Sequence, residues 1–583
     1  MAHIISGAAG SGKTTALYSL LKTDKGNKVL LVPDQFVFES ERRVADELDE
    51  KTSGIMVTGF MSLAEKILKK YCPRKIYADS TAKLAIMNRA VKLLAESFDF
   101  YGSAAKKPGF VSVCLSGVET LKSAGISSQK LYDIIAEDST VSSAPAHFTD
   151  KMHDIALFYS LYDKMLTELY DDRQDNLLLA ARTIAENDCF PKNTRVYIDG
   201  FDSFSGAQKE FLRAMADKGV DFTVAVCTND SGAEIFSECD KTKALFENQY
   251  AMDCGKPQKT EYTKLGDSAV RYKNDTLRVL RDLLQGGKAE KPADPHGVTL
   301  AYSRNMSGEA DFVCANIRKL VRCEGYRYSD IAVICAAPAK YRDAVRSAAL
   351  RYEVPIFADL PEPVSEKPLL RYLDCLLCAA EEPTGTKVLR YIRSGFARIP
   401  SDKKEGKTVP LTLRDQHIVE EYANRWDLKN RRWDRPFPHI TDDAEKAVEN
   451  IRNKIVSPLT EFEKSVRNVG GKELVKRFTE FLFDKADISA AIQGKCQDNS
   501  TRQLRYVKEL TEEYNNLWRN VSDMLTSLYE TLDDTPMTIG ELAALIRTCS
   551  AQINLSRPPK VLDSVLFGDP ARTRSRDVRA VFV

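Results

Sequence analysis

Apolar residues along this chain follow two different periods. Short, nearly continuous apolar runs occur at 28–33, 55–58, 194–199 and 221–227, and such runs are typical of strands that are buried on both faces. Between them, apolar residues recur every three or four positions, which is the period of a helix with one buried face. Strands that alternate with helices predict a parallel sheet, whose binding loops gather at the carboxyl ends of the strands.

Two long stretches depart from this alternation. From about 79 to 187, and again from about 368 to 538, amphipathic helices follow one another with few strand-like runs between them. Residues 251–295 are polar and rich in lysine and glycine, so we interpret them as a boundary region. A second α/β unit begins at Val298–Ala301, and strand-like character returns in the last segment, 561–583.

This order predicts an α/β protein with two parallel-sheet domains, each interrupted by a helical insertion domain. The expected boundaries are 1–78 with 188–265 for the first sheet domain, 79–187 for its insertion, 296–365 with 545–583 for the second sheet domain, and 366–544 for its insertion. The final strand at 578–583 has no residues after it to form a loop. We therefore expect the chain to be part of a longer protein, cut inside the second sheet domain.

The first fifteen residues combine a short buried strand, a glycine-rich loop and the start of an amphipathic helix. The loop fits G-x-x-x-x-G-K-[ST], in which glycines let the backbone turn and aim its N–H groups at a polyphosphate. In this pattern Lys13 reaches the β- and γ-phosphates and the Thr14 hydroxyl holds Mg²⁺. The pattern predicts an ATP–Mg²⁺ site, with a glycine-rich turn that binds nothing as the alternative. The loop residues are Gly7, Ala8, Ala9, Gly10, Ser11, Gly12, Lys13 and Thr14.

Composition narrows the class of protein only a little. The 43% of hydrophobic and 29% of charged residues are ordinary for a globular protein, and a net charge of +1 neither favours nor excludes nucleic acid. No apolar run approaches the ~18 residues of a membrane span, and Met1 leads directly into the first strand, so we expect a cytoplasmic protein. The 13 cysteines stand mostly alone, which suits reduced thiols. We expect core packing rather than a metal for Cys375 and Cys378, and the six histidines are scattered.

Several motifs, in a fixed order, carry a resemblance to one family. They are GAAGSGKTT at 7–15, LVPDQFVF at 31–38, VTGFMSLAEKIL at 57–68, KMHDIALFYSLYDKML at 151–166, VYIDGFDSFSGAQ at 196–208, DIAVICAAPAKY at 330–341, VPIFAD at 354–359, YIRSGFARI at 391–399 and LDSVLFGDPARTRSRDVRAVFV at 562–583. Together they resemble the N-terminal half of AddB, also called RexB, the B subunit of the bacterial ATP-dependent helicase–nuclease that processes DNA double-strand breaks. The phosphate loop alone is common to many NTPases, whereas the ordered set is specific and covers nearly the whole chain.

The resemblance implies a superfamily 1 helicase-like fold with two P-loop, RecA-like domains, which agrees with the predicted order of four lobes. It also implies a heterodimer with an AddA-like helicase–nuclease subunit, acting on double- and single-stranded DNA in recombinational repair. In that family the subunit scans for a recombination hotspot sequence (Chi). The family's nuclease domain and its iron–sulphur cluster would lie beyond Val583, so we assign neither to this chain.

Three side chains of a working helicase motor are missing. Val196–Asp199 resembles the Walker B strand, where Asp199 would help hold Mg²⁺, but Gly200 replaces the glutamate that polarises the attacking water. The strand ending at Thr228–Asp230 lacks the glutamine that senses the γ-phosphate, and Ala336 stands where a motor usually offers an arginine. Because losing one such contact costs ~10²–10⁵ in rate, we expect ATP to be bound but hydrolysed slowly or not at all, and we assign no catalytic residue.

The predicted DNA contacts lie in loops at the carboxyl ends of the strands, where aromatic stacking and basic charge would grip a single strand. They are Phe36, Phe60, Met61, Ser62, Arg572, Arg574 and Arg576. The alternative for Phe60 is core packing, and the alternative for the arginines is a solvated basic turn. Two other functions stay open: a structural scaffold that needs its partner to bind anything, and a P-loop kinase or nucleotide switch without DNA affinity.

Overall fold

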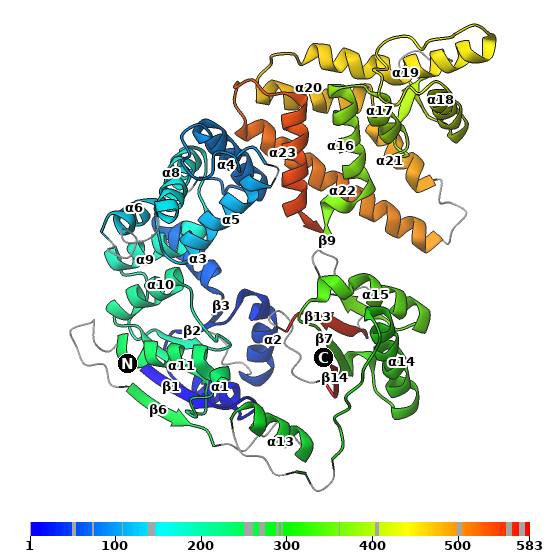
Figure 1. Cartoon of the computed structure of the whole chain (residues 1–583). Helices are drawn as coiled ribbons and strands as arrows, with labels where there is room; N and C mark the ends of the chain where they lie inside the picture. The colour runs from blue at the N-terminus through cyan, green and yellow to red at the C-terminus, as the bar shows by residue number, and fades with distance from the viewer. Residues whose placement is uncertain are drawn as a thin grey trace.

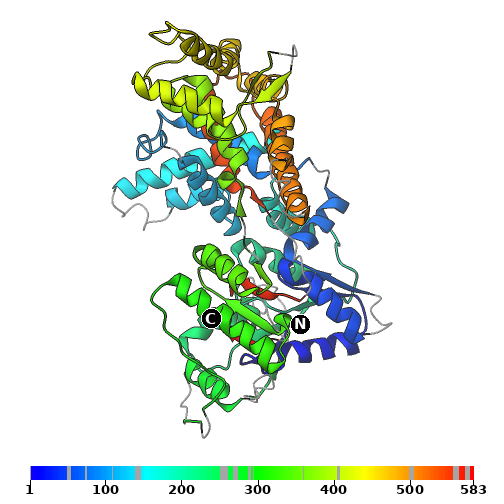
Figure 2. The same ribbon diagram turned by 90° about the vertical axis from the view of Figure 1, so that its right-hand side faces the viewer.

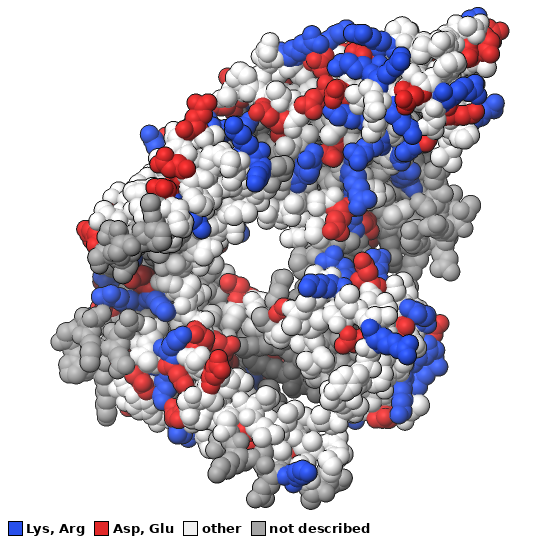
Figure 3. All heavy atoms as spheres, in the orientation of Figure 1, with Lys and Arg blue, Asp and Glu red and all other residues white. Residues whose placement is uncertain are grey.

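The structure is a computed structural model that places two sheet regions below an arch of helices (Figure 1). It describes residues 2–48, 54–72, 75–107, 109–137, 146–249, 260–266, 274–286, 291–292, 295–358, 360, 362–402, 407–497, 504–555, 563–570 and 578–583. A view turned by 90° shows the same two tiers, with the helices above the sheets (Figure 2). In the space-filling view an opening passes between the tiers, so the outline of the molecule is a ring (Figure 3).

The first sheet has six parallel strands in the order β3-β2-β4-β5-β1-β6. Their bounds are Ala2–Gly7 for β1, Lys28–Leu31 for β2, Ile55–Thr58 for β3, Arg195–Ile198 for β4, Asp221–Cys227 for β5 and Thr260–Lys264 for β6. The four apolar runs predicted as strands are confirmed. The strand β6 was missed because it lies in the stretch interpreted as a boundary region: its sequence TEYTK is polar, and an edge strand buries few side chains.

Helices cover both faces of this sheet. Ile5 and Leu30 pack with α1 and α2 on one face, whereas Ile4 and Leu31 pack with α3, α9 and α10 on the other. The bounds are Lys13–Thr23 for α1, Val37–Leu48 for α2, Phe60–Tyr71 for α3, Asn176–Glu186 for α9, Gly206–Asp217 for α10, Ser237–Ala244 for α11 and Asp275–Leu284 for α13. Burial on both faces explains why the central strands are apolar at almost every position.

The helices of the two predicted insertions share one hydrophobic core, which the sequence did not predict. In the first they are α4 (Ser80–Leu94), α5 (Phe110–Ser123), α6 (Ser128–Glu137) and α8 (Ala146–Leu169). In the second they are α16 (Pro368–Glu381), α17 (Gly385–Ile392), α18 (Leu413–Arg425), α19 (Asp443–Ser465), α20 (Gly471–Asp484), α21 (Ile488–Gln497), α22 (Leu504–Thr531) and α23 (Ile539–Gln552). Buried residues of both groups form a single cluster, and α4 lies against α22 and α23 (Figure 1).

Hydrogen bonds and ion pairs also connect the helices of the two insertions. The Ser527 hydroxyl donates to the Asp79 carboxylate over 2.8 Å, so the residue that caps α4 is held from the second insertion. The Tyr170 and Thr531 hydroxyls lie 3.1 Å apart. Two ion pairs, Arg89 with Asp533 and Lys92 with Glu541, cross the same junction at 2.8 and 2.6 Å. The arch of helices is therefore one packed body, although its two halves are far apart in the sequence.

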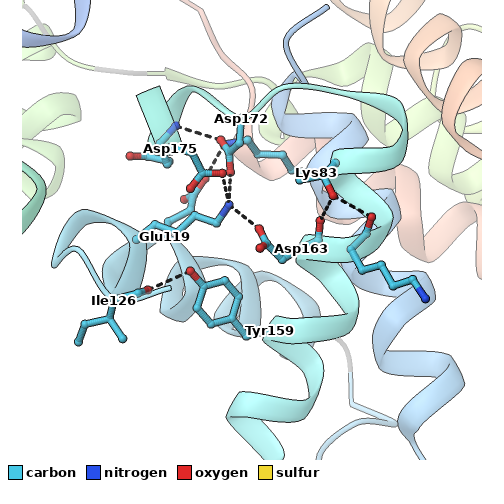
Figure 4. A network of polar contacts seen from close by, with 11 residues as sticks. Lys83, Glu119, Ile126, Tyr159, Asp163, Asp172 and Asp175 are labelled. Carbon is cyan, nitrogen blue, oxygen red and sulfur yellow. Dashed lines mark hydrogen bonds and ion pairs between the residues drawn. The ribbon is translucent and has the colours of Figure 1, made fainter. Parts of the chain in front are cut away.

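A buried charge network joins α4, α5 and α8 to the turn before α9, the helix that packs on the first sheet (Figure 4). Lys122 of α5, whose side chain is 2% exposed, lies 2.9, 3.0 and 2.6 Å from Asp163, Asp172 and Asp175. Lys83 of α4 reaches the second oxygen of Asp172 at 2.7 Å. Burial alone would lower the pKa of Lys122, but the three carboxylates outweigh burial and raise it. Burial would raise the pKa of Asp172, but Lys122 and Lys83 lower it, so both partners are held in their charged forms.

The second sheet has four parallel strands in the order β14-β7-β13-β8. They are β7 (Ile331–Ile334), β8 (Ile356–Ala358), β13 (Val565–Gly568) and β14 (Ala580–Phe582), and α14 (Met306–Glu324) and α15 (Pro338–Tyr352) pack on one face. Val298–Ala301, where the second α/β unit is expected to begin, form coil just before α14. Two short antiparallel pairs complete the described strands: β10 (Arg398–Pro400) with β11 (Thr408–Pro410), and β9 (Glu362–Pro363) with β12 (Asn554–Leu555).

Two further sequence features can be located in the fold. Among the described residues, no helix is both long enough and apolar enough to cross a bilayer. Cys375 and Cys378 lie partly buried in α16, where burial raises the pKa of both thiols. No cluster of histidine, cysteine and acidic side chains suited to a metal ion occurs within the described part of the chain.

Candidate phosphate-binding site

The glycine-rich loop connects β1 to α1 at the carboxyl edge of the first sheet. Gly10 and Gly12 have φ angles of 79° and 92°, in the left-handed region that favours glycine. The Ser11 N–H donates to the Ala8 carbonyl over 3.2 Å and closes the turn. No side chain caps the start of α1 at Gly12, so the amino end of this helix keeps donors for a ligand.

Two observations describe how closely the loop is packed and which polar atom it leaves for a ligand. The Ser11 hydroxyl oxygen is buried, and among the described residues it has no hydrogen-bond partner, which is the condition expected of a polar atom that a ligand would satisfy. A Cβ atom at Gly7 would lie 2.5 Å from that oxygen, so the close approach of the two backbone segments needs glycine at this position.

Lys13 and Thr14 take up different positions at the start of α1. The Lys13 ammonium group donates to the Ala8 carbonyl over 2.7 Å and so folds back across the loop. The Thr14 hydroxyl donates to the Asp199 carboxylate over 3.3 Å, although the two residues are 185 positions apart. The strand β4 ends just before Asp199, and β5 lies between β4 and β1, so the sheet itself brings the pair together. A hydroxyl beside a carboxylate is an oxygen donor set that suits Mg²⁺.

The backbone conformation at Gly200 restricts which residues can occupy this position. Its φ angle is 89°, a conformation that other residues rarely adopt. A glutamate at this position would therefore need a different turn after β4. Gly200 is consequently part of the loop's shape as well as a gap in the predicted motor machinery.

The polar groups of Thr228 and Asp202, near this site, form hydrogen bonds with residues of α11. The Thr228 hydroxyl, at the end of β5, donates to Asp240 over 2.5 Å. The Asp202 carboxylate accepts the Cys239 thiol at 3.7 Å, and its backbone carbonyl accepts the Thr242 hydroxyl at 2.8 Å. These contacts fasten α11 beside the loop that follows Asp199.

A further carboxylate, Asp34, lies where β2 and β3 end. A Cβ at Gly59 would come within 1.8 Å of an Asp34 carboxylate oxygen, so Gly59 is required for this approach. Burial and, second, the charge of Glu65 raise the pKa of Asp34. Asp34 was not predicted from the sequence, because only the fold shows that a glycine from the next strand leaves room for it.

The two aromatic residues predicted to contact DNA lie in the core, which corrects that prediction as far as stacking is concerned. Phe60 is 2% exposed and meets Phe201, Phe204 and Phe211 edge-on, with ring centroids 5.3, 5.8 and 6.1 Å away. Phe36 is also buried. Neither ring offers a face to a nucleobase in this structure, because Phe60 at the start of α3 packs in the core and Phe36, in the 3-10 turn just before α2, is buried.

The remaining predicted contacts differ in accessibility. Met61 is partly buried against the same core, and Ser62 is exposed. Arg572, Arg574 and Arg576 lie outside the described residues. An aromatic residue that was not predicted from the sequence, Phe38 in the first turn of α2, is 80% exposed. It lies two positions beyond Phe36, and its place on the polar side of an amphipathic helix was the signal that could have identified it.

The fold and the site define an α/β protein that carries a glycine-rich phosphate-type loop on the first of two parallel sheets. Residues 4–277 match the sequence family described as "ADDB, N-terminal". This part of the chain is therefore similar to that family, and the resemblance predicted from the sequence is confirmed.

Curated relatives match the whole chain. The chain is 24% identical over 622 aligned residues to the B subunit of the ATP-dependent helicase/deoxyribonuclease of Clostridium botulinum (strain Loch Maree), with 100% of this chain and 51% of the relative covered. It is 22% identical to the protein of the same name from Bacillus mycoides, of which it covers 52%, and 23% identical to that from Bacillus anthracis, also with 52% covered. The chain thus spans about half the length of the curated relatives it matches.

Proposed function

We propose that this chain is the helicase-like half of the B subunit of an ATP-dependent helicase/deoxyribonuclease, in which it binds ATP–Mg²⁺ and DNA without acting as a fast motor. The observation that carries the proposal is the meeting of Thr14 with Asp199 beside a loop whose Ser11 hydroxyl is buried without a partner among the described residues. The names of the relatives support the subunit role. We propose further that the two sheets are RecA-like domains in a superfamily 1 arrangement, and that an AddA-like subunit supplies the motor for repair of double-strand breaks and for recognition of the hotspot sequence.

In this proposal the chain's own residues hold the nucleotide. The loop N–H groups and the uncapped end of α1 bind the phosphates, and Lys13 exchanges its contact with Ala8 for the β- and γ-phosphate oxygens. Thr14 and Asp199 would hold Mg²⁺, which neutralises phosphate charge when bound. No described carboxylate follows Asp199 directly, and the φ angle of Gly200 disfavours any replacement, so hydrolysis is slow.

Titration of the 583-residue chain with MgATP in a calorimeter tests the binding site. Lys13→Ala should weaken binding roughly tenfold or more, because a charge-assisted contact to phosphate is lost. The control is Lys22→Ala, since Lys22 lies in the last turn of the same helix and should leave the affinity unchanged. Equal affinities for Lys13→Ala and the unaltered chain would contradict the proposal.

Steady-state ATPase measurements with single-stranded DNA test the claim of a slow motor. We expect a turnover well below ~1 s⁻¹. A faster turnover that disappears in Lys13→Ala would show that another group takes over the role of the missing glutamate.

Gel shifts with forked DNA, with and without the AddA-like partner, test the proposed DNA binding. Binding through phosphates should weaken steeply as the salt concentration rises.

A scaffold role is the second candidate, and the burial of Phe36 and Phe60 favours it, because two of the predicted stacking surfaces are not available. A scaffold would show no shift of forked DNA without the partner. The helicase-like role predicts a shift by the chain alone.

A further inference from the structure

The stretch 298–302 has the sequence of a strand but is exposed to solvent. Val298, Leu300 and Tyr302 alternate with Thr299 and Ala301, which is the period of a strand with one apolar face. In the structure this stretch is coil between α13 and α14 (Figure 1), with Leu300 79% and Tyr302 90% exposed and Val298 exposed as well. Three large apolar side chains that alternate along one exposed segment need an explanation.

The second sheet has a free position for such a strand. β14 pairs with β7 on one side, and no described strand pairs with it on the other. Ala580 and Phe582 face the core under α14, whereas Val581 on the opposite face is about half exposed. The outer N–H and C=O groups of an edge strand are ready to accept one more strand.

The handedness of the crossovers selects this edge. β7 connects through α15 to β8, which lies beyond β13, and α14 packs beside α15 on the same face of the sheet. Parallel crossovers are right-handed in nearly all proteins, so all crossovers on one face advance in one direction. A strand that enters β7 through α14 must therefore lie on the opposite side of β7 from β8, and β14 already occupies the place next to β7. The place that remains is the outer edge of β14.

The first sheet obeys the same rule and supports its use here. α1 and α2 lie on one face, and both connections, from β1 to β2 and from β2 to β3, advance in the same direction through the sheet.

The link between residues 298–302 and α14 is also long enough for this placement. Only Ser303–Asn305 separate the stretch from α14, whose first turn is capped by the Asn305 side chain, so the strand must end within ~11 Å of that helix.

We propose that residues 298–302 form a strap that docks as a fifth parallel strand along the free edge of β14, and that the coil is its undocked form. Docking would cover Val298, Leu300 and Tyr302 with the core under α14 and would pair the outer backbone groups of β14. Just before the strap, the His296 N–H donates to the Thr276 hydroxyl over 3.2 Å, and its carbonyl accepts the Asn274 amide over 3.0 Å. These contacts tie the strap to the start of α13. Docking would therefore fasten α13 to the second sheet and restrict movement between the two sheet domains.

Hydrogen exchange followed by mass spectrometry on the 583-residue chain tests the proposal. The amides of 299–302 should exchange at least about tenfold more slowly than in an unstructured peptide. Leu300→Asp should abolish that protection and also speed exchange in β14. The control is Leu413→Asp, since Leu413 is 83% exposed at the start of α18 and should leave both segments unchanged.

Two results would overturn the strap. One is exchange of 299–302 at the unprotected rate in the unaltered chain. The other is protection that appears only as the chain dimerises, judged by light scattering across a concentration series, because β14 would then be pairing with a second copy. Neither result depends on nucleotide or DNA binding, so the strap can fail while the proposed function stands.

Discussion

Gly200 and Asp199 are neighbours with opposite roles. The carboxylate of Asp199 meets the Thr14 hydroxyl and completes an oxygen pair suited to Mg²⁺, whereas the backbone of Gly200 turns the chain away through a left-handed conformation. A motor needs a carboxylate at the second position, and the turn leaves no unstrained place for one.

We predict that Gly200→Glu does not restore ATP hydrolysis. The substitution forces a residue with a Cβ into the left-handed region and should cost about 1 kcal/mol of unfolding free energy. Gly219→Glu is the matched control, because Gly219 has a φ angle of 80° and open space around its Cβ position, so it should cost about the same. Steady-state ATPase and urea unfolding measure the two effects. A Gly200→Glu chain that gains turnover would show that the loop can rearrange and that the backbone is not the obstacle.

At the scale of elements, the charge network around Lys122 holds α5 and α8 to the turn before α9, which packs on the first sheet. α5 supplies Lys122, α8 supplies Asp163, and the turn before α9 supplies Asp172 and Asp175. A buried network of this kind costs desolvation energy, so its members depend on one another: removing one leaves the others without compensation.

We predict that Asp172→Asn destabilises the chain by about 3 kcal/mol near neutral pH, because Lys122 and Lys83 lose a shared buried partner. The folded state lowers the pKa of Asp172, so its contribution is present above the ordinary value of 3.8 and is lost as the pH falls through the lower folded value. Urea unfolding at pH 7 and at decreasing acid pH should show the difference between the two chains shrinking only below about pH 4. Asp163→Asn, at a more exposed member of the network, should cost below about 1 kcal/mol. A difference that stays constant down to pH 3 would contradict this assignment.

At the scale of the whole molecule, the shared helical core makes two distant parts of the sequence one unit. The helix α4 is buried along most of its length because α5 and α8 pack on one side and α22 and α23 on another. The two sheet domains are then linked above by the arch of helices and below by the connection through α13 (Figure 1).

We predict that Leu542→Ala, in the buried face of α23, lowers stability by about 3 kcal/mol and raises hydrogen exchange in α4 and α8 as well as in α16. Lys92→Ala removes a surface ion pair at the same junction and should cost below about 1 kcal/mol. Faster exchange confined to α16, α22 and α23 would mean that the two insertions unfold separately.

Much of this architecture was predictable from local pattern. The strands of the first sheet, the helices of both insertions and the glycine loop follow from periodicity and glycine spacing, because buried strands and amphipathic helices leave distinct apolar patterns. The strand β6 was not predictable in this way, because an edge strand with a polar sequence leaves no apolar run. Phe60 illustrates the other difficulty: its sequence position fits both a stacking residue and a core residue, and only the surrounding Phe201, Phe204 and Phe211 decide between them.

The sequence by itself determined the glycine-rich loop, the absence of a glutamate after Asp199 and the alternation of sheet and helix, since each depends on residues that are close together in the chain. Only the tertiary structure decided that Asp199 reaches Thr14, that Gly200 lies in a left-handed turn, that the two insertions share a core and that Asp172 bridges two lysines. Those features arise from contacts between segments tens to hundreds of residues apart. No local period records such contacts, because their energy depends on which surfaces the whole fold brings together.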